Sequence, residues 1–398
     1  MRLALLAVLI ASPLLAQSSV ETAPSNTEAL AIYEINRARA NPQAYDTANS
    51  LGGILTGVAP ANPLALNERL ITSSRFHSTE MATNGYFAHT SAITGNQPNL
   101  MVRNAGYPLI SSFPSAANNL ESLACQFTSS SGGISYSAPN AIRALIEDAG
   151  VSPPGHRYHL LATGPSASFY AQFREIGTGY AEGFRPESPF SAGTPPDGSG
   201  AYWAIHTGVR DTAVYFICGV VYNDANTNGR YDLGEGLNGV TVSANGGGSV
   251  TVNALTNSAG MYWLNLNPAT WTLTCSGGTF VGPTYAQVTL STNNVAVDFR
   301  QGNVNVDINF GTWGALTGSA VQNGSTNPGA GSGGTGGSGS GGGGGSTPPP
   351  SGSSGTGDAG SGGCTSREHA GDFAALLVLT AGVLFVSARL KRTRRWAS

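Results

Sequence analysis

The stretch Ser152-Pro153-Pro154-Gly155-His156-Arg157-Tyr158-His159-Leu160-Leu161 places two imidazoles three residues apart, between a Pro-Pro-Gly turn and an apolar run. Two upstream segments carry further polar side chains, Phe87-Ala88-His89 and Asn119-Leu120-Glu121-Ser122. Histidines and carboxylates that converge in this way bind a divalent cation or act as a general acid and base. We therefore predict that His89, Glu121 and His156 meet at one site of the folded chain.

No short motif assigns a reaction to these residues. The sequence contains neither an H-E-x-x-H nor a C-x-x-C pattern, so a local metal motif is missing. It also lacks a G-x-S-x-G elbow, and a lipase-type serine nucleophile is therefore unsupported. Chemistry at this site depends on residues that are far apart in the sequence.

The distribution of charge argues against nucleic acid as a partner. The chain of 398 residues is long enough for two domains of ordinary size. Of its 19 basic residues, one is Arg2 and five lie in the last ten positions, which leaves 13 basic against 22 acidic groups in between. Such a segment lacks the cationic surface that neutralises phosphates.

Both ends of the chain predict export and attachment to a membrane. Arg2, the apolar run 3–15 and Ala16 have the layout of a secretory signal peptide spanning residues 1–16. Residues 373–388 are a weakly polar to apolar stretch before a basic cluster, which is typical of a C-terminal transmembrane anchor or sorting tail. The Gly/Ser/Pro-rich residues 318–363 are expected to be a disordered linker. We expect an extracellular, membrane-anchored protein at the cell surface.

Helices come first and strands last within residues 26–211. A capping box at Ser25-Asn26-Thr27-Glu28 precedes a helical pattern that Pro42 closes. Further helices are predicted from about Leu66 to Asn84 and after Pro139, and β-rich segments follow at 175–180 and 201–207. This order predicts an α+β domain.

Residues 216–311 have an all-β pattern, with short strands between Gly/Asn-rich turns, and they predict a small β-sandwich. One turn between these strands, Asp224 to Glu235, matches D-x-[DN]-x-[DN]-G-x5-E at every defined position. The spacing predicts a Ca²⁺ site, because hard cations prefer oxygen ligands and Gly229 permits the sharp turn. The expected ligands are Asp224, Asn226, Asn228, the carbonyl of Arg230, Asp232 and Glu235.

The same segment resembles the B-type repeats of bacterial surface adhesins. The likeness rests on Gly219-Val220-Val221-Tyr222-Asn223-Asp224 and on Thr256-Asn257-Ser258-Ala259-Gly260-Met261-Tyr262. Some such modules carry Lys–Asn cross-links. The only lysine of this chain is Lys391, in the tail, so that cross-link is chemically excluded here.

The order of motifs in residues 26–211 resembles the bacterial branch of the CAP superfamily, also called SCP/TAPS domains. The motifs are Asn36-Arg37-Ala38-Arg39-Ala40-Asn41-Pro42, His77-Ser78-Thr79-Glu80-Met81, Gly85-Tyr86-Phe87-Ala88-His89-Thr90, Asn119-Leu120-Glu121-Ser122-Leu123-Ala124, Gly155-His156-Arg157, Ile176-Gly177-Thr178-Gly179 and Tyr202-Trp203. The resemblance implies an α-β-α sandwich with a cleft that holds two histidines and two acidic residues.

Carried over by position, His89 and His156 match the cleft histidines. Glu121 matches the acid of a Gly-Glu-Asn motif, although Leu120 and Ser122 replace its neighbours. The second acid is matched by Glu147, with Asp148 as the alternative. Three other histidines have simpler interpretations: His77 as a hydrogen-bonded core residue of a helix, His159 as a residue that follows the turn, and His206 as a structural strand residue.

The four cysteines leave their pairing open. Gly362-Gly363-Cys364 before an apolar segment and arginines resembles the cysteine-bearing sorting tails of myxobacteria, which implies that Cys364 is a processing or lipid-attachment site. Export permits disulfides, so Cys218 and Cys275 are expected to pair within the sandwich, and buried thiols are the alternative.

Three functions follow as hypotheses. The first is a surface-tethered CAP-domain protein that binds a small ligand, a lipid, a cell-wall component or a divalent metal such as Zn²⁺ in its cleft. The second is a secreted metal-dependent hydrolase that uses His89, Glu121 and His156. The third is a structural adhesin. Because a fold does not determine a function, the site itself must discriminate between them.

Overall fold

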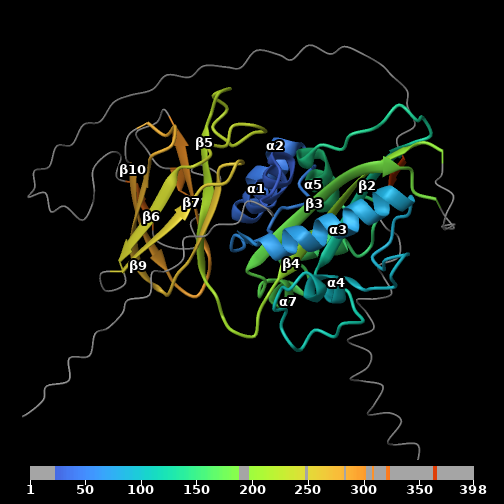
Figure 1. Cartoon of the computed structure of the whole chain (residues 1–398), viewed down its shortest axis with the longest axis horizontal. Helices are drawn as coiled ribbons and strands as arrows, with labels where there is room; N and C mark the ends of the chain where they lie inside the picture. The colour runs from blue at the N-terminus through green and yellow to red at the C-terminus, as the bar shows by residue number, and fades with distance from the viewer. Residues whose placement is uncertain are drawn as a thin grey trace, which may run out of the picture.

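The computed structural model describes residues 23–187, 197–246, 250–281 and 284–301, together with the backbone of short strands at 307–308, 320–322 and 362–364. The chain is mixed α/β with several β-sheets, as its sequence predicted at that level. Its strands divide between a first unit, in which helices accompany a sheet, and a second unit formed of strands (Figure 1).

The helices all belong to the first unit within the described residues. They are α1 (Asn26–Ala40), α2 (Pro42–Asn49), α3 (Glu68–Asn84), α4 (Pro98–Asn104), α5 (Ala138–Glu147), α6 (Gly155–Leu161) and α7 (Ala167–Tyr170). The predicted capping box is present, because the side chains of Ser25 and Glu28 each accept a hydrogen bond from the other's backbone N–H. Gly85 ends α3 in the left-handed conformation at φ 67°, which favours glycine.

The sheet of the first unit has the strand order β1-β3-β4-β2. Its strands are β1 (Ala65–Leu66), β2 (Glu121–Thr128), β3 (Glu175–Phe184) and β4 (Ser199–Gly208), with β14 (Gly362–Cys364) along the outer edge of β2. β1 pairs with β3 in parallel, and the other pairs are antiparallel. The register sets Glu121 directly opposite His206, which fixes the centre of the site described below.

Helices lie on both faces of this sheet (Figure 1). On one face α3 approaches the backbone of β3 so closely that a Cβ atom at Gly177 would lie 2.2 Å from the carbonyl carbon of Leu70. On the other face the hydroxyl of Thr178 donates to the backbone carbonyl of Glu28 in α1. Alternate residues of a strand point to opposite faces. Gly177 and Gly179 therefore allow α3 to approach one face closely, while Thr178 between them contacts α1 on the other face.

The second unit contains two further sheets, with strand orders β13-β10-β9-β6-β7 and β12-β11-β5-β8. The strands are β5 (Phe216–Asn223), β6 (Thr241–Gly246), β7 (Val250–Leu255), β8 (Met261–Asn265), β9 (Ala269–Ser276), β10 (Thr284–Leu290), β11 (Val295–Gln301), β12 (Asp307–Ile308) and β13 (Ala320–Gln322). Apolar side chains of both sheets form one core, to which Val221, Leu273 and Val297 belong. The two sheets of the second unit therefore share one core.

The two units are packed against each other. The ring of Tyr231, in the turn after β5, lies edge-on to that of Tyr33 in α1, with centroids 5.4 Å apart. The Asn294 side chain donates to the backbone carbonyls of Pro63 and Arg174, at 3.0 and 2.7 Å. Val220 and Met261 of the second unit belong to the same apolar cluster as α1. The interface between the two units is therefore part of the hydrophobic core that contains α1.

The disulfide predicted between Cys218 and Cys275 is not formed. Both residues are free cysteines with buried side chains. Cys218 packs with Ala65 and Phe216 on the side of its sheet that faces the first unit. Cys275 lies instead in the core between the two sheets of the sandwich. Burial raises the pKa of both thiols, which stabilises them in the protonated form.

Several predictions concern other parts of the chain. The predicted signal peptide 1–16, most of the predicted linker 318–363 and the apolar segment 373–388 lie outside the described residues. Among the helices that are described, none combines the length and the hydropathy needed to cross a membrane. The backbone of Cys364 is described as the last residue of β14.

Candidate metal centre

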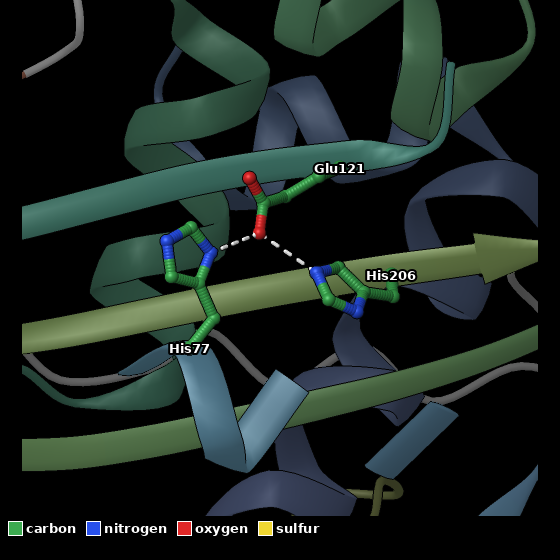
Figure 2. Close-up of side chains that lie close together, drawn as sticks. All are labelled: His77, Glu121 and His206. Carbon is green, nitrogen blue, oxygen red and sulfur yellow. Dashed lines mark hydrogen bonds and ion pairs between the residues drawn. The ribbon is translucent and has the colours of Figure 1, made fainter. Parts of the chain in front are cut away.

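Glu121 is the centre of a buried polar cluster in the first unit. Its Oε2 atom lies 2.5 Å from Nδ1 of His77 and 2.7 Å from Nε2 of His206. Its Oε1 atom lies 2.5 Å from Nδ1 of His89. Figure 2 shows the carboxylate of β2 between the ring from α3 and the ring from β4. One carboxylate thus contacts three imidazoles from three segments.

The local sequence explains how these segments meet. Glu121 and His206 are opposite each other in the β2–β4 ladder, and directly opposite side chains project from the same face. His77 lies one helical turn after Ser73 on α3, so both face the sheet. The Ser73 hydroxyl lies 2.8 Å from Nδ1 of His206, so α3 contacts this ring as well as the carboxylate.

Asn118 attaches the loop before β2 to the same cluster. Its Oδ1 accepts from the backbone N–H of Glu121 at 2.9 Å, and its Nδ2 lies 3.0 Å from Nδ1 of His89. The hydrogen bond to the backbone N–H of Glu121 holds the first residue of β2 against this loop.

The histidines determine the charge of Glu121. Burial raises the pKa of this carboxyl, but the attraction of His77 and the hydrogen bonds from His206, His77 and His89 outweigh burial and set the pKa well below its usual value. An ionised carboxylate only accepts hydrogen bonds, so each ring nitrogen that faces it carries a proton. Nε2 of His77 then points away from Glu121, and it is buried with no hydrogen-bond partner among the described residues.

A second imidazole–carboxylate pair lies nearby. Asp148 follows α5 in the left-handed conformation, at φ 50°. Its Oδ1 lies 2.8 Å from Nδ1 of His156, and its Oδ2 accepts from the backbone N–H of the same residue at 3.0 Å. Burial lowers the pKa of His89 against the opposing effect of Glu121, and the charges of His156 and His77 lower it further.

Glu147 does not contribute to the site, which corrects its assignment as the second acid. Its side chain is 41% exposed and lies 3.8 Å from Arg143, one turn earlier on α5. Asp148, the alternative, is the acid that contacts His156. The reason is local. Glu147 is the last residue of α5, so its side chain projects from the helix surface, whereas Asp148 has left-handed backbone angles and lies outside the helix.

His159 is a neutral core residue beside the cluster. Its Nδ1 lies 2.7 Å from the hydroxyl of Ser122, and its Nε2 lies 2.7 Å from the hydroxyl of Thr207. Burial lowers its pKa to about 3, with further lowering by nearby cationic groups, of which His156 has the largest effect. Its interpretation as a residue that merely follows the turn was too limited, because it connects α6 to β2 and β4.

The site is closed rather than open. His89 is 7% exposed and His156 is 4% exposed, while His77 and His206 are fully buried. His89 contacts Glu121, whereas His156 contacts Asp148, and both histidines are nearly buried rather than lining an open cleft. His77 and His206, expected to have structural roles, are direct partners of Glu121. The four-residue spacing of Ser73 and His77 on an inward helix face was the signal available for His77.

His77, Glu121 and His206 form a group that is able to hold a metal ion, since their ligand atoms all lie within 4.8 Å of one another. Nitrogen and oxygen ligands suit Zn²⁺, with bonds of about 2.0–2.1 Å, and tetrahedral ligands then lie roughly 3.3 Å apart. The present contacts of 2.5 and 2.7 Å are hydrogen bonds. An ion would replace their protons and widen the spacing by less than about 1 Å.

The residues predicted to bind calcium form a compact turn. Asp224 accepts from the backbone N–H groups of Asn228 and Gly229, at 3.0 and 2.9 Å. Glu235 accepts from those of Ala225 and Asp232, at 3.0 and 2.9 Å. Among the described residues, the carboxylate oxygens of Asp224, Asp232 and Glu235 do not all lie within 4.8 Å of one another, as the ligand atoms of His77, Glu121 and His206 do. Calcium binding stays a prediction.

Comparison with known proteins adds no identification. No model of a protein family matches the chain, and a search of curated proteins finds no relative.

Proposed function

We propose that this protein is an exported, surface-tethered binding protein whose first unit holds a divalent cation at His77, Glu121 and His206. The observation that carries the proposal is the position of Glu121, an ionised buried carboxylate with imidazoles on both of its oxygens. Imidazole nitrogen and carboxylate oxygen are the ligands of Zn²⁺ sites, and Zn²⁺ is therefore the cation expected.

Burial of the group supports binding rather than hydrolysis. A catalytic metal needs a coordination position that water or substrate can reach, and a group with no exposed side chain gives neither of them access. The side chains of His77, Glu121 and His206 are all 0% exposed. A cation here would join α3, β2 and β4, the three elements that supply its ligands.

The wider architecture of the proposal follows the sequence. Helices on both faces of a central sheet, the contact of His89 with Glu121 and the pairing of His156 with Asp148 support a CAP-type first unit. The second unit is its stalk, with a weak Ca²⁺ site in the turn Asp224 to Glu235. The turn geometry supports this site, because Gly229 has φ 80° and donates its N–H to Asp224. The signal-like N-terminus and the apolar, basic C-terminus support export and attachment.

Metal titration of the full-length protein tests the cation site. Zn²⁺ is titrated against a chromophoric chelator, and we expect one ion per chain with release of protons, because ligand N–H groups must be deprotonated. Glu121→Gln and His206→Gln should each weaken binding by roughly 100-fold or more, since each removes a ligand.

His159→Gln is the matched control, because His159 is equally buried but is bonded to Ser122 and Thr207. Its affinity for Zn²⁺ should stay close to that of the wild type. Circular dichroism verifies that each variant is folded. Wild-type affinity in folded Glu121→Gln and His206→Gln variants, or no uptake by the wild type, contradicts the proposal.

A further inference from the structure

Two buried serine hydroxyls of the first unit each lie against the Nδ1 atom of a histidine. The hydroxyl of Ser122 lies 2.7 Å from Nδ1 of His159, whose Nε2 lies 2.7 Å from a threonine hydroxyl. The hydroxyl of Ser73 lies 2.8 Å from Nδ1 of His206, whose Nε2 lies 2.7 Å from Oε2 of Glu121 (Figure 2). Only the Ser73 contact therefore leads to the group that is able to hold a cation.

The imidazole of His206 is held at both of its nitrogen atoms. Glu121 is ionised and only accepts hydrogen bonds, so the Nε2 atom that faces it carries a proton. A ring that ligates a cation through Nε2 instead carries its proton on Nδ1, and the partner of Nδ1 determines how the ring is oriented. The hydroxyl of Ser73 is the group that Nδ1 of His206 faces.

We propose that Ser73 is a positioning residue, which holds the ring of His206 in the form that ligates a cation, with the proton on Nδ1. A serine hydroxyl has one donor and two acceptor lone pairs. It therefore donates to an unprotonated Nδ1 and accepts from a protonated one, so both states of the ring keep the same partner. This inference rests on the proposed cation site, and it gives a role to a residue that is not one of the ligands.

The position of Ser73 connects two of the ligands. Ser73 is buried one turn before His77 on α3, so the helix that supplies one ligand also orients the ligand of β4. His77 differs in this respect, because its Nε2 atom is buried with no hydrogen-bond partner among the described residues. Partners that orient a metal-bound histidine typically contribute about 10–100-fold to metal affinity.

Competition with a chromophoric chelator, carried out on the full-length protein, measures this contribution. Ser73→Ala should bind Zn²⁺ about 10–100-fold more weakly than the wild type, because the hydroxyl that orients His206 is gone. Ser74→Ala is the matched control, since Ser74 is the next residue of α3, is equally buried and donates its hydroxyl to the backbone carbonyl of Gly177. Each variant loses one buried hydrogen bond, so their unfolding in urea should be similar, but Ser74→Ala should keep the Zn²⁺ affinity of the wild type.

NMR of isotope-labelled histidine rings adds a readout that a general loss of stability does not change. With Zn²⁺ in excess, Nδ1 of His206 should carry a slowly exchanging proton in the wild type and in Ser74→Ala. The signal is assigned by its absence from His206→Gln. In Ser73→Ala this proton should exchange faster with water, because the hydroxyl that accepts its hydrogen bond is gone.

The outcomes separate the role of Ser73 from the cation site itself. Wild-type Zn²⁺ affinity in a folded Ser73→Ala variant overturns the role of Ser73 and leaves the site intact. A Zn²⁺-bound wild type in which Nδ1 of His206 carries no proton does the same. A wild type that takes up no Zn²⁺ overturns the cation site, and the role of Ser73 with it.

Discussion

Glu147 and Asp148 are neighbours in the sequence, yet only Asp148 contacts a histidine. The difference arises from the end of α5, where Asp148 takes the left-handed conformation and turns its carboxylate onto His156. The turn 149–154 returns the chain to that carboxylate, which then accepts from the first turn of α6. A pattern of residue types does not reveal such a turn, and the choice between the two acids was open for that reason.

Removal of the Asp148 carboxylate should destabilise the protein. Asp148→Ala leaves the N–H of His156 and its ring without their buried partner, which costs about 1.5–3 kcal/mol for a charged hydrogen bond. Glu147→Ala is the matched control, and its half-exposed side chain should change stability by less than about 0.5 kcal/mol. Urea unfolding at pH 7 measures both values. Equal losses for the two variants would contradict the assignment.

Stability should fall with acid below about pH 6.5, the ordinary pKa of histidine. The folded chain lowers the pKa of His159 to about 3, chiefly by burial, so between these values the unfolded chain binds the proton more readily. Stability is therefore complete above pH 6.5 and is lost as the pH falls toward 3. The lowered pKa of Glu121 adds a loss that begins only near its ordinary pKa of about 4.5.

Urea unfolding at pH 7.5, 6 and 5 measures this dependence, with His159→Gln as the comparison. The variant is less stable at pH 7.5, but its stability should change less between pH 7.5 and 5. If wild-type stability is the same at pH 7.5 and pH 5, the neutral state inferred for His159 is wrong.

Among the elements, α3 is the one whose position depends most visibly on glycine. Gly177 and Gly179 both face the helix, and a Cβ on either would lie within 2.3 Å of its backbone. The sequence allowed the helix, its Gly85 stop and the two strands to be predicted, because these depend on local signals. It did not show that α3 lies on Gly177, since this contact depends on which face of β3 meets the helix.

Gly177→Ala should displace α3 and weaken the site that it supports. The added methyl group meets backbone rather than a flexible side chain, so destabilisation by about 1–3 kcal/mol or more is expected. Zn²⁺ affinity should fall too, because α3 carries His77. Gly155→Ala is the matched control, since its Cβ would meet no atom within 4 Å. Thermal unfolding and the chelator titration measure both effects, and an unaffected Gly177→Ala variant would contradict this role.

Across the whole molecule, the turn predicted to bind calcium is also one of the places where the second unit touches the first. Tyr231 lies within this turn, and its backbone N–H donates to the hydroxyl of Tyr33 in α1 at 3.2 Å. The sequence predicted the turn and the sandwich separately. It gave no sign of this docking, because the contact joins residues 198 positions apart.

Calcium should therefore stabilise the full chain. Sites of this kind bind with Kd on the order of 10⁻⁴–10⁻³ M, so 10 mM Ca²⁺ adds about 1.4–2.7 kcal/mol of folding free energy. Melting curves with 10 mM Ca²⁺ and with excess EDTA measure the difference. The variant Asp224→Asn/Glu235→Gln should show none, and an unchanged wild-type melt in EDTA would count against the site.

Anomalous diffraction at the zinc edge would locate a cation held by His77, Glu121 and His206. Crystals of the protein grown with one equivalent of Zn²⁺ should show a peak about 2.0–2.2 Å from an imidazole nitrogen of His77, an imidazole nitrogen of His206 and an oxygen of Glu121. A peak elsewhere, with the three side chains still hydrogen-bonded to one another, would show that they do not hold the cation.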